Sequence, residues 1–136
     1  MRKTIFLLFL ILSTMLISAK SETSYTVVQN SANPSAKYVL YPTTNMWAFL
    51  KLDTSNGIIT QVHYSLDSNS RGEVMLNSVS LIGYDETPIN GRFALYPTQN
   101  MFNFILLDTH TGQTWQVQWS NESENRDIVR IPQFFY

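Results

Sequence analysis

Alternating apolar and polar side chains mark short strands along this chain. The clearest strand carries Trp115, Val117 and Trp119 on one face. Its opposite face carries Gln116 and Gln118. A period of two is the pattern of a β-strand, and one apolar face with one polar face is typical of an antiparallel sheet with a solvated side. After the first twenty residues no apolar stripe at helical spacing is sustained, so we predict an all-β fold.

The strand pattern occurs twice, 55 residues apart and without a gap. Residues 38–76 and 93–131 share 17 identities over 39 aligned positions. The shared segment Leu-Tyr-Pro-Thr-x-Asn-Met begins at Leu40 and again at Leu95. Such a duplication predicts two copies of one structural unit. We call 38–76 the first repeat and 93–131 the second repeat.

Each repeat predicts four short strands. Proline ends the first strand because it lacks the N–H that a ladder requires. The sequence Asp-Thr-x-x-Gly predicts a tight hairpin after the second strand, with glycine accepting a positive φ. The expected strands are 38–41, 46–52, 58–65 and 73–80 in the first repeat, and 93–96, 101–107, 113–120 and 127–131 in the second.

Neither repeat can bury its apolar face alone, so the two units should pack together. We predict a β-sandwich or a small barrel with a pseudo-two-fold axis. A propeller is less favoured because two blades cannot close a ring. In the first repeat Gln61 and His63 should form the polar face, and Lys51 replaces Leu106, which predicts that this position reaches water.

The N-terminus predicts a secretory signal peptide over residues 1–19. Arg2 and Lys3 form a positive n-region before an apolar run over 5–17, and Ser18 and Ala19 are small residues at the cleavage position. The run is short for a membrane span, although a retained anchor is the alternative. We therefore expect secretion, with no stable membrane span after signal cleavage. A polar leader (20–35) around a short strand at 25–28 and a single β domain (36–136) should follow.

Net charge and cysteine content limit the possible partners and the possible sources of stability. Removing Arg2 and Lys3 leaves seven Lys and Arg residues against ten Asp and Glu, a formal charge of −3. A mildly acidic chain with no basic cluster argues against nucleic acid as a partner. The chain has no cysteine, so an exported domain must be stabilised by burial rather than by disulfides.

The sequence offers few catalytic groups. It has no cysteine nucleophile, and its two histidines, His63 and His110, lie in unmatched elements. Asp53 and Asp108 could form an acid pair, but each opens an Asp-Thr-x-x-Gly turn, where aspartate accepts backbone N–H bonds. Calcium is a lesser option because further carboxylates are missing from these turns. We expect no enzyme activity, no metal and no cofactor.

Aromatic residues suggest a recognition surface instead. Aromatic faces stack on sugar rings, while amide and imidazole groups bind hydroxyls. The alternative is that regularly alternating tryptophans form core. The Tyr-Pro-Thr-x-Asn loop is the strongest candidate because both repeats keep it although loops tolerate change. The alternative for this loop is a fixed turn geometry that the fold itself requires. The candidate ligand-binding residues are Tyr41, Asn45, Trp47, Tyr96, Asn100 and Trp119.

The pattern YPTxNM…LD…GxxWQVQ, complete in the second repeat, resembles small secreted proteins of Bacteroides-like gut bacteria, over about residues 36–131. The resemblance implies export across the inner membrane of a Gram-negative cell, to the periplasm or beyond. It brings no function and no site residues. The Leu-Asp-Thr-x-x-Gly-x-x-Trp part also looks like the hairpin of a propeller repeat, a local similarity that hairpin chemistry explains.

These observations favour a secreted, non-catalytic binding module for an extracellular or envelope glycan. The alternative is a protein-binding factor, such as an inhibitor, an immunity protein or an envelope assembly component. Small size and mild acidity fit both functions. The sequence does not predict an oligomeric state.

Overall fold

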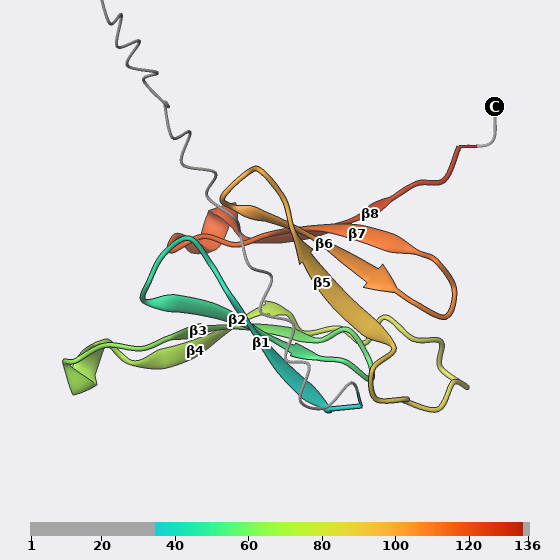
Figure 1. Cartoon of the computed structure of the whole chain (residues 1–136), viewed down its shortest axis with the longest axis horizontal. Helices are drawn as coiled ribbons and strands as arrows, with labels where there is room; N and C mark the ends of the chain where they lie inside the picture. The colour runs from blue at the N-terminus through green and yellow to red at the C-terminus, as the bar shows by residue number, and fades with distance from the viewer. Residues whose placement is uncertain (1–34, 135–136) are drawn as a thin grey trace, which may run out of the picture.

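The computed structural model describes residues 35–134, in which two four-stranded antiparallel sheets lie one over the other (Figure 1). The predicted signal peptide and the strand expected at 25–28 lie outside the described residues. Each sheet is a meander formed by one repeat. The first contains β1 (Tyr38–Pro42), β2 (Ala48–Asp53), β3 (Ile59–His63) and β4 (Gly72–Asn77). The second contains β5 (Phe93–Pro97), β6 (Asn103–Asp108), β7 (Thr114–Gln118) and β8 (Asp127–Ile131).

The predicted all-β, duplicated fold is confirmed, as two open sheets rather than a small barrel. Glycine turns join the middle strands as expected: Gly57 and Gly112 have φ of 79° and 74°. Their N–H groups donate to the carbonyls of Asp53 and Asp108 at 2.9 and 2.8 Å. A short 3-10 helix precedes the last strand of each repeat, η1 (Ser68–Ser70) and η2 (Ser123–Asn125).

Most strand boundaries lie one to three residues from the predicted positions, and at two of them polar side chains turn the backbone. β2 begins at Ala48 rather than at 46, since the Thr43 hydroxyl donates to the Ala48 carbonyl (2.9 Å) and accepts from the Asn45 N–H (3.2 Å). β4 ends at Asn77 rather than at 80. There the Asn77 side chain accepts from the Val79 N–H at 3.1 Å.

Strand pairing defines two faces in each sheet. Face A of the first repeat contains the cross-strand row Leu40, Lys51, Thr60 and Met75, and face A of the second contains Leu95, Leu106, Trp115 and Arg130. Face B of the first repeat contains Tyr41, Leu50, Gln61 and Val74, and face B of the second contains Tyr96, Ile105, Gln116 and Val129.

The two repeats bury opposite faces. Leu50 on face B of the first repeat is 0% exposed, whereas its equivalent Ile105 is only half-buried. Leu106 on face A of the second repeat is also 0% exposed, whereas Lys51 is half-buried. The core therefore lies between face B of the first repeat and face A of the second. Its buried apolar residues are Ala48, Leu50, Leu52, Ile59, Phe93, Leu95, Phe104, Leu106, Trp115, Val117 and Trp119.

Equivalent residues would be buried in both repeats if a two-fold axis related the sheets. The pseudo-two-fold axis expected from the duplication is therefore replaced by a one-directional stacking of unlike faces. The polar face expected for the first repeat is also corrected. Gln61 lies on the buried face, where its Nε2 donates to the Ser120 carbonyl at 3.1 Å and so joins the two sheets.

Candidate functional site

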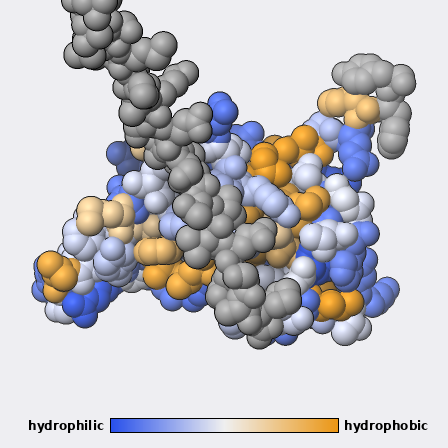
Figure 2. All heavy atoms as spheres, viewed as in Figure 1, coloured by the Kyte–Doolittle hydropathy of each residue, from blue (hydrophilic) through white to orange (hydrophobic). Residues whose placement is uncertain are grey.

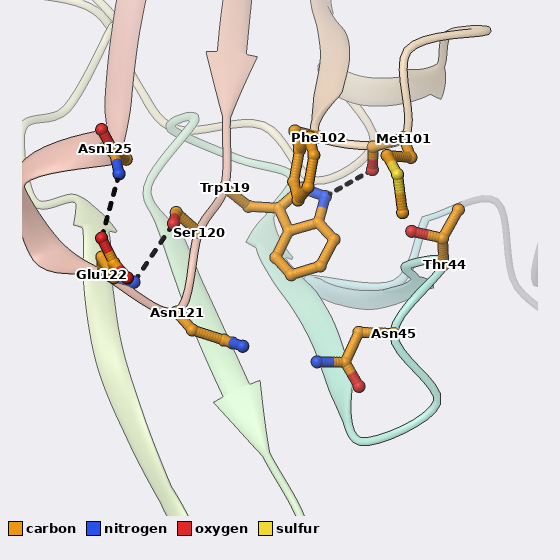
Figure 3. Close-up of a pocket in the computed structure, with 9 residues that line it drawn as sticks. All are labelled: Thr44, Asn45, Met101, Phe102, Trp119, Ser120, Asn121, Glu122 and Asn125. Carbon is orange, nitrogen blue, oxygen red and sulfur yellow. Dashed lines mark hydrogen bonds between the residues drawn. The ribbon is translucent and has the colours of Figure 1, made fainter.

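A pocket of about 380 Å³ opens where the two repeats meet (Figure 3). The loop between β1 and β2 contributes Thr44 and Asn45 from the first repeat. The second repeat supplies the remaining side chains, from the loop before β6 and from the segment after β7. These are Met101, Phe102, Trp119, Ser120, Asn121, Glu122 and Asn125.

Two aromatic rings form the apolar wall of the pocket. Trp119 is 2% exposed and its indole Nε1 donates to the Met101 carbonyl at 2.9 Å, which fixes the ring. Phe102 packs beside it, with ring centroids 5.6 Å apart and a 47° angle between the planes. Phe102 remains 45% exposed. Trp119 thus supports the wall, and Phe102 offers an accessible aromatic surface.

Polar groups face this wall. The amides of Asn45 and Asn121 point toward one another from opposite sides of the pocket in Figure 3. Glu122 lies at the rim, where its backbone N–H donates to the Ser120 hydroxyl at 3.1 Å. Asn125 donates to the Glu122 carboxylate at 3.4 Å. Amides both donate and accept, so the pocket offers both kinds of hydrogen bond beside an apolar surface.

An arginine holds the loop that carries these polar groups. Arg126 donates from Nε to the Ser120 carbonyl and from Nη2 to the Asn121 carbonyl, both at 2.8 Å. In the first repeat Arg71 binds the Ser65 carbonyl at 2.7 Å in the same way. The recurrence of this arginine in both repeats is the sequence signal for an ordered loop.

Only two of the six predicted ligand-binding residues, Asn45 and Trp119, line the pocket. Asn45 and Asn100 hold equivalent turns, in which their side-chain oxygens accept from the N–H groups of Trp47 and Phe102 at 2.9 and 3.0 Å. Trp47 packs on another aromatic ring, Tyr64, with centroids 5.2 Å apart.

The predicted tyrosines lie on different surfaces. Tyr41 packs partly buried against the core, and burial raises the pKa of its hydroxyl, although a hydrogen bond from the Leu95 backbone opposes this shift. Tyr96 is 41% exposed on face B of the second repeat. Trp115 is buried in the core, 6.2 Å from the Phe93 ring centroid. The aromatic residues therefore do not form one continuous platform.

Sequence reasoning missed Phe102, Asn121 and Glu122. Phe102 follows the duplicated Asn-Met and aligns with Trp47, but no pattern in the sequence marks it as a ligand-binding residue. Glu122 aligns with Asp67, a conservative match that marks the loop without marking a pocket. These residues become a site only through the contact between the repeats.

The aspartates that could have formed a catalytic pair hold turns, as predicted. Asp53 accepts from the Ser55 N–H at 3.0 Å, and Asp108 accepts from the His110 N–H at 2.9 Å. Within residues 35–134 no group of three His, Cys, Asp or Glu side chains is placed to hold a metal ion.

Comparison with protein-family models, with curated proteins and with solved structures finds no match to this chain. Over the part of the chain that the structure describes, no helix is both long enough and apolar enough to cross a membrane.

Proposed function

We propose that this protein is a secreted or periplasmic, non-catalytic binding module that recognises an extracellular or envelope glycan in the pocket between its repeats. The supporting observation is the exposed ring of Phe102 beside the amides of Asn45 and Asn121. A sugar ring has an apolar C–H face and a rim of hydroxyl groups, so it needs these two kinds of surface together.

Each lining residue has a distinct part in this proposal. Phe102 packs against the C–H face of a sugar ring. Asn45 and Asn121 bind hydroxyls from two sides, and the Glu122 carboxylate accepts from a third hydroxyl. Because Arg126 already holds the loop by two hydrogen bonds, little ordering is needed on binding.

A glycan array probed with the purified protein tests this proposal. Hits are then titrated by calorimetry with the Phe102→Ala and Asn121→Ala variants. Each variant is expected to bind at least ten-fold more weakly, which corresponds to about 1.4 kcal/mol. The matched control is Tyr84→Ala, because Tyr84 is a fully exposed aromatic residue outside the pocket. It should bind as the unchanged protein does.

Equal losses in the Tyr84 variant would indicate non-specific aromatic adhesion and would contradict a glycan site in the pocket. An array without hits, from protein shown to be folded by circular dichroism, would also count against the proposal. The alternative of a protein-binding factor would then be tested by a pull-down from cell envelopes.

A further inference from the structure

Each sheet has one face that no other described element covers. Face A of the first repeat exposes Leu40, Tyr38 and Met75, which are 52%, 55% and 51% accessible. Face B of the second repeat exposes Tyr96 and Val129, at 41% and 52%. Hydrophobic residues are visible on the molecular surface in Figure 2. Exposed apolar surface of this kind commonly marks an interface.

The packing inside the chain identifies what could cover these faces. Face A of the second repeat packs on face B of the first, so one face A and one face B remain unused. They belong to the same two kinds of surface that already fit together in the core. A contact between unlike faces can be repeated from one molecule to the next, in contrast to a two-fold contact, which is complete with two partners.

The residues equivalent to this pocket's lining also occur in the other repeat of each pair, where they form two separate halves of a second pocket. Asn100 occupies the position of Asn45 and makes the same turn bond, in which the Phe102 N–H donates to Asn100 Oδ1 at 3.0 Å. Trp47 and Tyr64 occupy the positions of Phe102 and Trp119. The N–H of Tyr64 donates to the Trp47 carbonyl at 3.1 Å, and the N–H of Trp119 donates to the Phe102 carbonyl at 3.0 Å.

Within one chain these halves cannot meet, because they lie at the two outer faces of the stack. The Asn100 loop belongs to the second repeat, and the aromatic half belongs to the first. Arg71 holds the loop after Tyr64 through the equivalent pair of bonds, donating to the carbonyls of Ser65 and Leu66 at 2.7 and 3.2 Å. Hydrogen bonds therefore order both halves, although neither half meets the complementary half within the described residues.

We propose that copies of this chain assemble head to tail, with face A of the first repeat of one copy packed on face B of the second repeat of the next. Each contact would bring the Asn100 loop of one copy to Trp47 and Tyr64 of its neighbour. The assembly would thereby complete a second pocket with an equivalent asparagine and aromatic pair but with Leu66 in place of Asn121, formed between copies instead of between repeats.

One pair of side chains makes this contact more polar than the core. Lys51 and Glu73 form an ion pair on face A of the first repeat, where the second repeat has Leu106 and Ile128. Because each charge already has its partner, covering them leaves no unpaired charge. The contact between copies is consequently weaker than the contact between repeats, and assembly depends on concentration.

Repeated stacking of four-stranded sheets in one direction closes into a ring when the rotation between sheets allows it. Known rings of such sheets have about four to eight blades. Two blades cannot close alone, but two to four copies of a two-blade chain can. The expected product is therefore a closed ring of two to four chains.

Native mass spectrometry and light scattering on the purified protein measure its mass over a dilution series. We expect a discrete multiple of two to four chains that dissociates to monomer on dilution. Leu40→Glu on face A and Val129→Glu on face B should each give monomers. The matched control is Val79→Glu, which changes a 65% exposed residue in the linker and should assemble normally.

Mixing the two monomeric variants separates this proposal from a dimer in which a face of one copy contacts the same face of the other copy. The Leu40→Glu chain keeps its face B, and the Val129→Glu chain keeps its face A, so one good contact remains. The mixture should form a one-to-one dimer and stop there, since the other contact would bring two glutamates together. If either variant fails to fold by circular dichroism, Met75→Glu or Tyr96→Glu replaces it.

Three results would overturn the proposal: a monomer at every concentration, normal assembly of the Leu40→Glu chain, or a variant mixture that stays monomeric. None of these measurements uses a ligand. The proposed assembly can therefore be disproved even if the pocket between the repeats binds a glycan. Equally, assembly can be observed even if that pocket binds no glycan.

Discussion

Replacing Arg92 by methionine is expected to lower the free energy of unfolding by about 3–5 kcal/mol. Arg92 is 5% exposed and binds Asp108 through two hydrogen bonds, Nε to Oδ1 at 3.0 Å and Nη2 to Oδ2 at 2.8 Å. Its remaining nitrogen contacts the Glu86 carboxylate. Asp108 is itself only 1% exposed, so the variant would leave a buried carboxylate without its cation. Urea unfolding followed by tryptophan fluorescence measures the loss.

The first repeat supplies a matched control. Lys37 is equivalent to Arg92, and its ammonium lies 3.9 Å from the Asp53 carboxylate, with 54% of the side chain exposed. Exposed pairs contribute about 1 kcal/mol or less, so Lys37→Met should change stability little. Equal losses in the two variants would contradict a special contribution from the buried pair.

The same pair predicts how stability depends on pH. Burial alone would raise the pKa of Asp108, but hydrogen bonds from Arg92, from Thr111 and from the His110 backbone outweigh it and lower the pKa to about 2. A folded-state pKa below the unfolded value of about 3.9 means that this stabilisation is present above that pH. It is lost as the pH falls from about 4 toward 2. The free energy of unfolding of the Asp108→Asn variant, measured over the same pH range, should not show this loss.

The sequence predicted the strands and hairpins well because local chemistry decides them. Proline limits β1 and β5, and glycine with positive φ allows the turns at Gly57 and Gly112. Which face of each sheet is buried was not predictable in this way. The second strand of the second repeat is apolar on both faces, so its own pattern fits either orientation. In the first repeat the polar residues Lys51 and Gln61 lie on opposite faces, so the pattern there fits either orientation as well. Gln61 shows the consequence, as a polar residue that is 0% exposed.

The candidate site was predictable only in part for a related reason. The duplicated loop predicted Asn45 and the aromatic pattern predicted Trp119, and both residues line the pocket. Asn121 lies in the loop between β7 and η2 and has no equivalent asparagine in the first repeat. Its place beside Asn45 follows from the stacking of the sheets. A site between two repeats therefore requires their relative placement, which no local pattern contains.

Stacking of unlike faces predicts that equivalent alanine substitutions differ strongly between the repeats. Leu50→Ala removes a side chain from the core and should cost about 2–5 kcal/mol, whereas Ile105→Ala, at the equivalent half-buried position, should cost about 1 kcal/mol. The order reverses one residue later, where Leu106→Ala should cost as much as Leu50→Ala and Lys51→Ala should cost little.

These four variants are best compared in the Leu40→Glu background, because assembly would otherwise bury Ile105 and add its own contribution to stability. Urea unfolding then reports on the single chain alone. A two-fold arrangement would make Leu50 and Ile105 equally costly to truncate, and would do the same for Lys51 and Leu106. Only the stacking of face A on face B places the large loss at Leu50 in one repeat and at Leu106 in the other.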